Sequence, residues 1–237
     1  MGAQFATRWL MLLGMSAPRL HVPAVPARPG EAPDFSYVRL SPAGAIRCLP
    51  IDAPVSATVP LAEELIRVLD EAHQAVGPWN PQLEPQVLRR GLRIMLQTRV
   101  FDDRMQRAQR QGRITFYVRS LGEEAVSVAA ALALADRDML FPSYRNQGLF
   151  LARGLTLVEL MSQLLSNTHD MCKGRQLPVM YHSVAQRLFS ISGNLATQFP
   201  QAVGWAMAAA IKGEADIAAA WIGEGSTAAA DFHHALT

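Results

Sequence analysis

Two short apolar segments, each next to turn-forming residues, constrain the fold more than any other feature of the sequence. Residues 138–141 read Asp-Met-Leu-Phe and are stopped by Pro142, while residues 216–222 lie between Gly213 and Gly223. Both segments are typical of short buried strands, although alanine is a poor strand former and the second assignment rests on its flanking glycines. Helix-forming sequence separates the two, which predicts βαβ units with a parallel sheet, the α/β class.

Helical spacing of apolar residues, together with turn signals, predicts the helices around these strands. Pro85 opens a long helix, Glu123 and Glu124 suit the start of another, and Gly213 ends the most helix-like segment. Residues 113–121 are rich in β-branched and aromatic side chains and are expected to be extended. The expected helices span residues 61–75, 86–111, 122–135, 156–165 and 197–212, with a further one from Ser226.

Composition narrows the class of protein. The chain has 237 residues, of which 50% are hydrophobic, so a packed core of one or two domains is expected. A formal net charge of +2 argues against binding to nucleic acid or to an anionic membrane. Cys48 and Cys172 are too few for a disulfide framework. No apolar run approaches the roughly 20 residues of a membrane span. We expect a cytoplasmic protein, because the outline of a signal peptide at the beginning of the chain is weak.

The beginning of the chain differs in character from the rest. Residues 1–60 are rich in proline and predict an extended arm ahead of an α/β domain over residues 61–237. The arm is either docked through residues such as Phe35 and Tyr37, which we favour, or a disordered linker. Its first residues have the outline of a weak signal peptide, but we expect a misassigned start or a tail, with Met15 as an alternative initiator.

The long helix expected over residues 86–111 carries a run of arginines. Asp102 and Asp103 interrupt this run, and aromatic residues are not interleaved with it as they are in stacking platforms for RNA. The pattern therefore favours a solvated helix face over an RNA-binding surface.

The sharpest local signal follows the second expected strand, in Gly223-Glu224-Gly225-Ser226-Thr227. Ligands of open parallel sheets bind beyond the carboxyl ends of the strands, and a helix start at that place offers N–H groups to phosphate. Glycines allow the backbone to approach a ligand closely, and Glu224 can supply an oxygen ligand to Mg²⁺. An ordinary strand–turn–helix corner is the alternative.

Two further polar segments are candidates for the same site. Tyr144 and Arg145 follow the first expected strand, where a guanidinium fork and a phenol hydroxyl suit diphosphate oxygens, or where they simply lie on the surface. The turn over residues 191–198 precedes the most helix-like segment. Either Asn194 or Thr197 caps that helix, or the turn contacts a cofactor ring or a monovalent cation.

These motifs, in this order, strongly resemble the α subunit of branched-chain 2-oxo acid dehydrogenases, the thiamine-diphosphate-dependent decarboxylating component, in its bacterial form. The resemblance extends from about Arg19 to Thr237 and includes the proline-rich arm. It is carried by Phe116-Tyr117, Leu121–Glu124, Pro142–Arg145, Lys173–Pro178, Ile191–Gln198 and Gly223–His233.

The resemblance implies a thiamine-diphosphate-binding fold, a doubly wound parallel sheet that is incomplete in this chain. It also implies a cofactor at the interface with a β subunit, with the diphosphate end on the α side. The activating glutamate belongs to the β subunit in that family, so no catalytic residue is assigned in this chain. The matching positions are Tyr144, Arg145, Leu195, Gly223, Gly225 and Ser226 for the cofactor, Glu224 for Mg²⁺, Ser192, Thr197 and Gln198 for K⁺, and Phe116 and Tyr117 for the acyl pocket.

The activity implied by the resemblance is that of a 3-methyl-2-oxobutanoate dehydrogenase. Such an enzyme oxidatively decarboxylates the branched-chain 2-oxo acids derived from Val, Leu and Ile and passes the acyl group to lipoyl-lysine of an acyltransferase component. A heterotetramer of two α and two β subunits is implied as well. The alternatives are a pyruvate or acetoin dehydrogenase α subunit, or a non-catalytic fragment that only pairs with the β subunit.

Three features depart from the family pattern. Glu224 stands where bacterial relatives usually carry aspartate, and we expect Mg²⁺ binding to tolerate the extra methylene. Ala229 and Ala230 replace an acidic–polar pair, with no predicted consequence. The chain stops at Thr237, before the asparagine that completes the Mg²⁺ site in the family. We therefore expect this polypeptide alone to bind the cofactor poorly, to aggregate and to have no turnover.

Overall fold

The structure is a computed structural model that describes residues 30, 32 and 40–237. The described residues fall into two compact units, one up to Gln82 and one from Leu83 to Thr237. Most of the arm predicted over residues 1–60, including Phe35 and Tyr37, lies outside the described residues. The described part of the first unit contains α2 (Val55–Thr58) and the 3₁₀ helix η1 (Val59–Glu63).

The first unit shows that the helix predicted over residues 61–75 is wrong. After η1 the chain becomes irregular, and an antiparallel bridge closes a turn around Asp70. Asp70 Oδ1 accepts the backbone N–H groups of Ala72 at 2.9 Å and Gln74 at 2.8 Å. An aspartate that binds the backbone following it in this way favours a turn over a helix.

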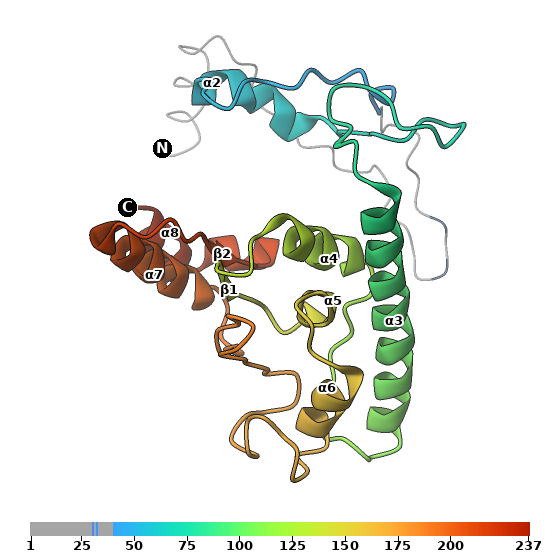
Figure 1. The fold of residues 1–237 in the computed structure, drawn as a ribbon, viewed down its shortest axis with the longest axis vertical. Helices are drawn as coiled ribbons and strands as arrows, with labels where there is room; N and C mark the ends of the chain where they lie inside the picture. Colours follow the sequence, from blue (N-terminus) through green and yellow to red (C-terminus); the bar gives the residue numbers. More distant parts are fainter. Residues whose placement is uncertain (1–29, 31, 33–39) are drawn as a thin grey trace. The chain divides into compact units, whose positions relative to one another are not determined.

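The second unit confirms most of the helices and both strands predicted from the sequence (Figure 1). The helix predicted from Ser226 is wrong in its start, because a 3₁₀ turn precedes it, and one short helix was not predicted. Residues 113–121 are irregular, with no strand assigned to them. The elements are α3 (Pro85–Arg110), α4 (Glu124–Ala133), β1 (Met139–Phe141), α5 (Gln147–Ala152), α6 (Leu157–Leu164), α7 (Gln198–Lys212), β2 (Ala218–Ala220), η2 (Glu224–Ala228) and α8 (Ala230–Leu236).

β1 and β2 pair in parallel, with Met139 opposite Ala218 and Phe141 opposite Ala220. Helix α7 packs against both strands, and the rings of Phe141 and Trp205 meet edge to face with centroids 6.3 Å apart. This pair is the whole sheet among the residues that the structure describes. The α/β class is thus seen as one parallel pair, and the doubly wound order stays a prediction.

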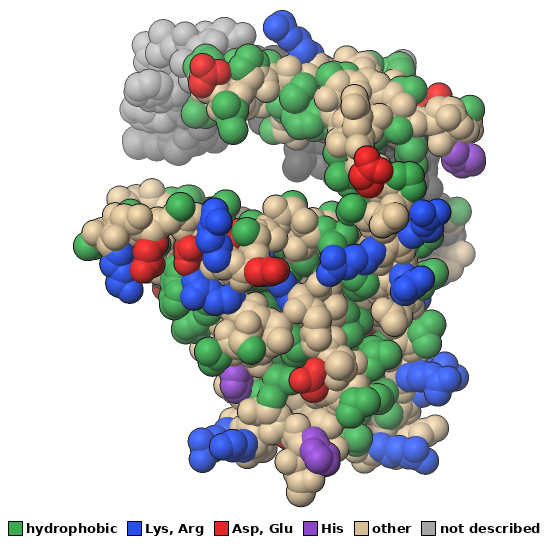
Figure 2. Space-filling model, viewed as in Figure 1, with side chains coloured by type: hydrophobic (Ala, Val, Ile, Leu, Met, Phe, Trp, Pro, Cys, Tyr) green, Lys and Arg blue, Asp and Glu red, His purple; other side chains and the backbone are tan. Residues whose placement is uncertain are grey.

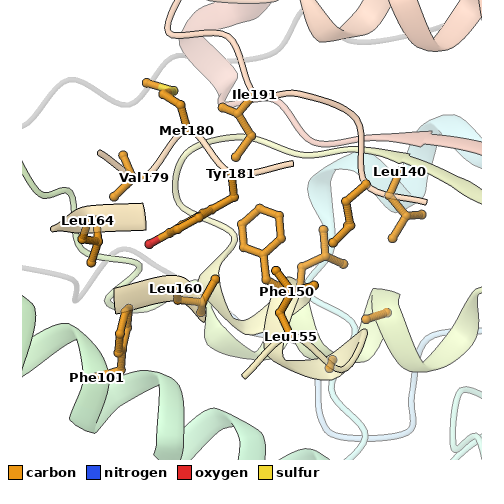
Figure 3. Close-up of a cluster of buried hydrophobic side chains, with 14 of the residues drawn as sticks. Phe101, Leu140, Phe150, Leu155, Leu160, Leu164, Val179, Met180, Tyr181 and Ile191 are labelled. Atoms are coloured by element: carbon orange, nitrogen blue, oxygen red, sulfur yellow. The ribbon is translucent and has the colours of Figure 1, made fainter. Parts of the chain in front are cut away.

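The main hydrophobic core lies between the helices α3 to α6 and the loop that follows α6. Figure 3 shows the Phe150 ring of α5 facing Tyr181 from this loop, in an edge-to-face contact with centroids 5.0 Å apart. Leu140, Leu160 and Val179 are fully buried around the two rings. The core therefore joins β1, α6 and a long irregular loop, and it holds the loop in place despite its lack of regular structure.

Helix α3 buries one side and exposes the other. Its buried residues include Gly91, where an added Cβ atom would lie 3.4 Å from Leu132 Cδ1, an ordinary van der Waals contact with α4. The opposite side carries exposed arginines, which lie along α3 in Figure 2, as expected for a solvated face. Three leucines at four-residue spacing are also exposed there: Leu88, Leu92 and Leu96. No helix in the described part of the chain is long and apolar enough to cross a membrane.

The two cysteines lie in very different surroundings. Cys48 is exposed in the first unit, and Cys172 is buried in the second. The Cys172 Sγ atom lies 3.3 Å from His182 Nδ1. Burial, with the nearby Asp170 carboxylate, raises the pKa of the Cys172 thiol to about 11. The thiol is therefore protonated near neutral pH.

Asp138 fixes the position of β1 beside β2. Its Oδ1 accepts the backbone N–H of Ile217 at 3.0 Å, and its Oδ2 accepts that of Ala135 at 2.8 Å. We expect Asp138→Ala to lower the free energy of unfolding by about 2 kcal/mol, because it leaves both N–H groups without an acceptor. The exposed Glu214→Ala, which removes a surface ion pair with Lys212, should lower it by less than about 1 kcal/mol. Urea denaturation checks this, and equal losses in both variants would contradict it.

Candidate functional site

A cavity of about 510 Å³ opens where β1 and β2 end. Because the strands are parallel, their carboxyl ends lie at the same edge, and the segments that follow them both reach the cavity. The turn before α7 and the start of α4 complete its wall. The lining residues are Glu123, Val126, Ser143, Tyr144, Arg145, Asn146, Ser192, Asn194, Leu195, Gln198, Trp221, Ile222, Gly223, Glu224, Gly225 and Ser226.

The structure brings together most of the site residues predicted from the sequence. Those that line the cavity are Tyr144, Arg145, Ser192, Leu195, Gln198, Gly223, Glu224, Gly225 and Ser226. Thr197, Phe116 and Tyr117 do not line it. Phe116 is 44% exposed, whereas Tyr117 is buried and donates its hydroxyl hydrogen to Asp102.

Buried amides hold the turn after β1. Asn146 Oδ1 accepts the backbone N–H of Ser143 at 2.7 Å, and Asn146 Nδ2 donates to Ser127 Oγ at 2.9 Å. Gln147 Nε2 donates to the carbonyls of Val118 and Tyr144. Both amide side chains are buried, so hydrogen bonds from the protein interior hold the turn that carries Tyr144 at the cavity.

Arg145 is the positively charged residue of the cavity wall. Its Nη1 donates to the backbone carbonyl of Arg119 at 2.8 Å, and its guanidinium carbon lies 5.7 Å from the centre of the Tyr144 ring. The side chain is exposed, and these contacts leave further guanidinium N–H groups for a ligand. Arg145 therefore presents a fixed positive charge with several donors toward the cavity.

The glycines after β2 are not required by the packing of the chain itself. A Cβ atom at Gly223 or Gly225 would meet nothing within 4 Å, and neither residue has a positive φ. The backbone of this turn is therefore open to the cavity. Glu224 between them is exposed, and Ser226 is buried. The first helical residue after the turn is Ala230, so the predicted α-helix start at Ser226 is replaced by η2.

The turn before α7 is polar and tightly bent. Ser192 Oγ accepts the backbone N–H of Asn194 at 3.1 Å, and Ala196 has a φ of +66° while fully buried. Thr197 occupies the N-cap position, but its hydroxyl donates to the Asn194 carbonyl and no side chain caps the helix. The predicted capping role of Asn194 or Thr197 is wrong, because the helix begins directly from this bend.

Gln198 carries an unpaired acceptor at the cavity wall. Its Nε2 donates to the Trp221 carbonyl at 2.6 Å, which ties α7 to the end of β2. Its Oε1 is buried and has no hydrogen-bond partner. A buried carbonyl oxygen without a partner is unfavourable unless a donor or a cation satisfies it.

Negative charge also faces the cavity. Partial burial raises the pKa of Glu123, the Arg145 guanidinium opposes this shift, and the Glu124 and Glu224 carboxylates add to it. Within the described ranges, no three His, Cys, Asp or Glu side chains converge as a metal site. A metal ion at Glu224 would therefore need further oxygen ligands, which a bound phosphate could supply.

Glu123 and Val126 were not predicted as site residues. The sequence shows Glu123 only as part of an acidic pair that suits a helix start. Packing of α4 against α3 and α5 brings the start of α4 to the cavity. Such packing between distant segments cannot be predicted from a local sequence motif.

The comparison with protein families identifies the family to which this chain belongs. A family model described as "Dehydrogenase E1 component" matches residues 92–237, which is more than half of the chain and includes every residue of the cavity wall. The chain belongs to the dehydrogenase E1 component family. This family is thiamine diphosphate dependent. A second model, described as "2-oxoisovalerate dehydrogenase E1 alpha subunit N terminal", matches residues 16–56.

Several curated relatives of this E1 chain are named as alpha subunits of 2-oxoisovalerate dehydrogenase. The chain is 58% identical over 219 residues to the "2-oxoisovalerate dehydrogenase subunit alpha" of Pseudomonas aeruginosa, covering 92% of this chain and 53% of that relative. It is 36% identical over 170 residues to the mitochondrial subunit alpha of Homo sapiens, covering 71% of this chain and 38% of the relative. The chain thus spans about half the length of the bacterial relative.

The ion pair between Arg99 and Glu124, the residue after Glu123 of the cavity wall, gives a pH-dependent prediction for this E1 chain. Arg99 Nε donates to Glu124 Oε1 at 2.6 Å and holds the pKa of Glu124 below its usual value of 4.5. The stabilisation is therefore complete above pH 4.5 and is lost as the pH falls through the lowered pKa. We expect Arg99→Gln to lower the free energy of unfolding at neutral pH, with the difference from wild type shrinking in acid.

Denaturant unfolding at a series of pH values measures this difference. Arg93→Gln, at an exposed position on the same helix, is the control and should leave stability unchanged throughout. A difference between Arg99→Gln and wild type that persists unchanged in acid would show that the charge of Glu124 is not responsible.

Proposed function

We propose that these residues form part of the α subunit of a thiamine-diphosphate-dependent enzyme that oxidatively decarboxylates branched-chain 2-oxo acids. The enzyme passes the acyl group to lipoyl-lysine of an acyltransferase component. The observation that carries this proposal is the 58% identity with a 2-oxoisovalerate dehydrogenase subunit alpha over 92% of this chain. The match of residues 16–56 to an N-terminal model of the same name favours the branched-chain substrate over pyruvate or acetoin.

The shape and charge of the cavity wall suit the diphosphate end of the cofactor. Arg145 and Tyr144 would bind diphosphate oxygens through charge-assisted and hydroxyl hydrogen bonds. The backbone at Gly223, Gly225 and Ser226, which is open at the two glycines, would approach the phosphates from the turn that follows the neighbouring strand β2. Thiamine diphosphate, when bound, supplies the electron sink for decarboxylation.

The proposal assigns two ions to polar groups at the cavity wall and directly beside it. Glu224 would bind Mg²⁺ as a carboxylate ligand, with diphosphate oxygens as further ligands. K⁺ would be bound by Gln198 together with Ser192 and Thr197, and the unpaired Gln198 Oε1 supports this assignment. The main chain of Leu195 would meet the aminopyrimidine ring.

The remaining parts of the proposal concern partners and substrate. E1 α subunits of this family pair with a β subunit and an acyltransferase component. We propose a heterotetramer of two α and two β subunits in the cytoplasm, with the lipoyl domain as acyl acceptor. Phe116 and Tyr117 remain proposed contributors to the acyl pocket, supported only by the family pattern because neither lines the described cavity.

The diphosphate site can be tested by binding. Arg145→Ala in the full protein, assembled with its β subunit, should weaken thiamine diphosphate by at least about tenfold and leave the affinity for thiamine unchanged, because thiamine lacks the diphosphate. Quenching of tryptophan fluorescence provides the measurement, since Trp221 lines the cavity. Arg89→Ala, on the exposed side of α3, serves as the control. An equal loss of affinity for thiamine diphosphate and for thiamine would show that Arg145 does not bind the diphosphate.

The substrate can be tested by turnover of the assembled enzyme. We expect thiamine-diphosphate-dependent release of carbon dioxide from 2-oxoisovalerate with a kcat/KM at least about tenfold above that for pyruvate, as apolar pockets discriminate by methylene groups. A preference for pyruvate or acetoin would assign the enzyme to those dehydrogenases. Co-purification with a β subunit without turnover of any 2-oxo acid would favour a non-catalytic role.

A further inference from the structure

Asp102 is a fully buried carboxylate on α3 that holds the chain segment behind the cavity. Its Oδ2 accepts the backbone N–H of Ser120 at 2.7 Å and the Ser120 hydroxyl at 2.9 Å. Its Oδ1 accepts the Tyr117 hydroxyl at 2.6 Å. These three donors suit an acceptor-only, ionised carboxylate, and removing the carboxylate would leave them without a partner in the protein interior.

The segment held by Asp102 is the one that orients Arg145. The carbonyl of Arg119, directly before Ser120, accepts Arg145 Nη1 at 2.8 Å. On either side of it, the Val118 carbonyl accepts Gln147 Nε2 at 2.9 Å and the Ser120 carbonyl accepts the backbone N–H of Glu123 at 2.8 Å. Three consecutive carbonyls thus support the turn after β1, the cavity arginine and the start of α4.

This segment has no regular structure of its own. No strand is assigned in residues 113–121, so hydrogen bonds from neighbouring elements determine where its carbonyls point. Asp102 supplies two of these bonds to a single residue, Ser120. The adjacent Asp103 forms an ion pair with the Arg119 side chain, which adds a second link from α3.

We propose that Asp102 is a positioning residue for the diphosphate site, acting through Ser120 and the Arg119 carbonyl on the guanidinium of Arg145. The proposal rests on the proposed function of the cavity. Its physical basis is that a charge-assisted hydrogen bond to phosphate depends strongly on geometry, so a displaced Arg119 carbonyl misaligns the Arg145 donors. Asp102 itself does not line the cavity.

The test measures binding of thiamine diphosphate and thiamine, each with Mg²⁺, to the full protein with its β subunit. Asp102→Ala should weaken thiamine diphosphate about tenfold without changing the affinity for thiamine. Asp102→Asn should restore most of this loss, because the amide oxygen can still accept from Ser120 and the amide nitrogen can donate to Tyr117. Thr98→Val, at a buried α3 position one turn away whose hydroxyl donates to Ile94, is the matched control and should bind as wild type does.

A double-variant comparison separates positioning from general damage. In an Arg145→Ala background, Asp102→Ala should cause no additional loss of thiamine diphosphate affinity, because the group through which it acts is absent. An equal loss in both backgrounds, or an equal loss for thiamine, would overturn the proposal. If Asp102→Ala fails to fold, Ser120→Ala should still weaken thiamine diphosphate about threefold through loss of one hydrogen bond, and wild-type affinity in that variant would overturn the proposal.

The same measurements distinguish this inference from the proposed function on which it rests. A wild-type protein that does not bind thiamine diphosphate would overturn both. A wild-type protein that binds the cofactor, with Asp102→Ala binding it equally well, would overturn the positioning role of Asp102 alone.

Discussion

The parallel pairing of β1 with β2 is the constraint on which the cavity depends. Only three residues of each strand are paired, yet this pairing places the two following turns at one edge. The turn after β1 carries Arg145, and the turn after β2 carries Glu224. An antiparallel arrangement would send these two charged side chains to opposite ends of the sheet. Strand direction therefore brings a positively and a negatively charged side chain to the same cavity.

Buried amide and carboxylate side chains, rather than regular secondary structure, hold the cavity wall in shape. Asn146 and Gln147 support one turn, Gln198 joins α7 to the end of β2, and Asp102 holds the irregular segment behind Arg145. Side chains with fixed hydrogen bonds can keep irregular backbone in one conformation where no strand or helix does so. The backbone of the cavity wall is thus supported by buried polar side chains.

Much of this arrangement follows from the sequence, and the failures have physical causes. The strands and the helices α3, α4, α6 and α7 were predictable because apolar spacing, prolines and glycines mark them locally. The helix predicted at 61–75 was wrong because the turn-forming side chain of Asp70 competes with helical hydrogen bonds. Glu123 was missed as a wall residue because only packing between distant segments places it there. The polar turns after both expected strands were predictable from local sequence, whereas the roles of the site residues came from the resemblance to a family and their mutual distances required the structure.

The contrast between the two cysteines has a practical consequence. Cys48 is exposed and lies in the unit that ends at Gln82, while Cys172 is buried in the other unit with a pKa raised to about 11. Thiol reagents react with the thiolate, so a limiting amount of a maleimide dye at neutral pH will label the first unit before the second. The native sequence thus provides a site-selective attachment point for a spectroscopic probe without prior removal of a cysteine.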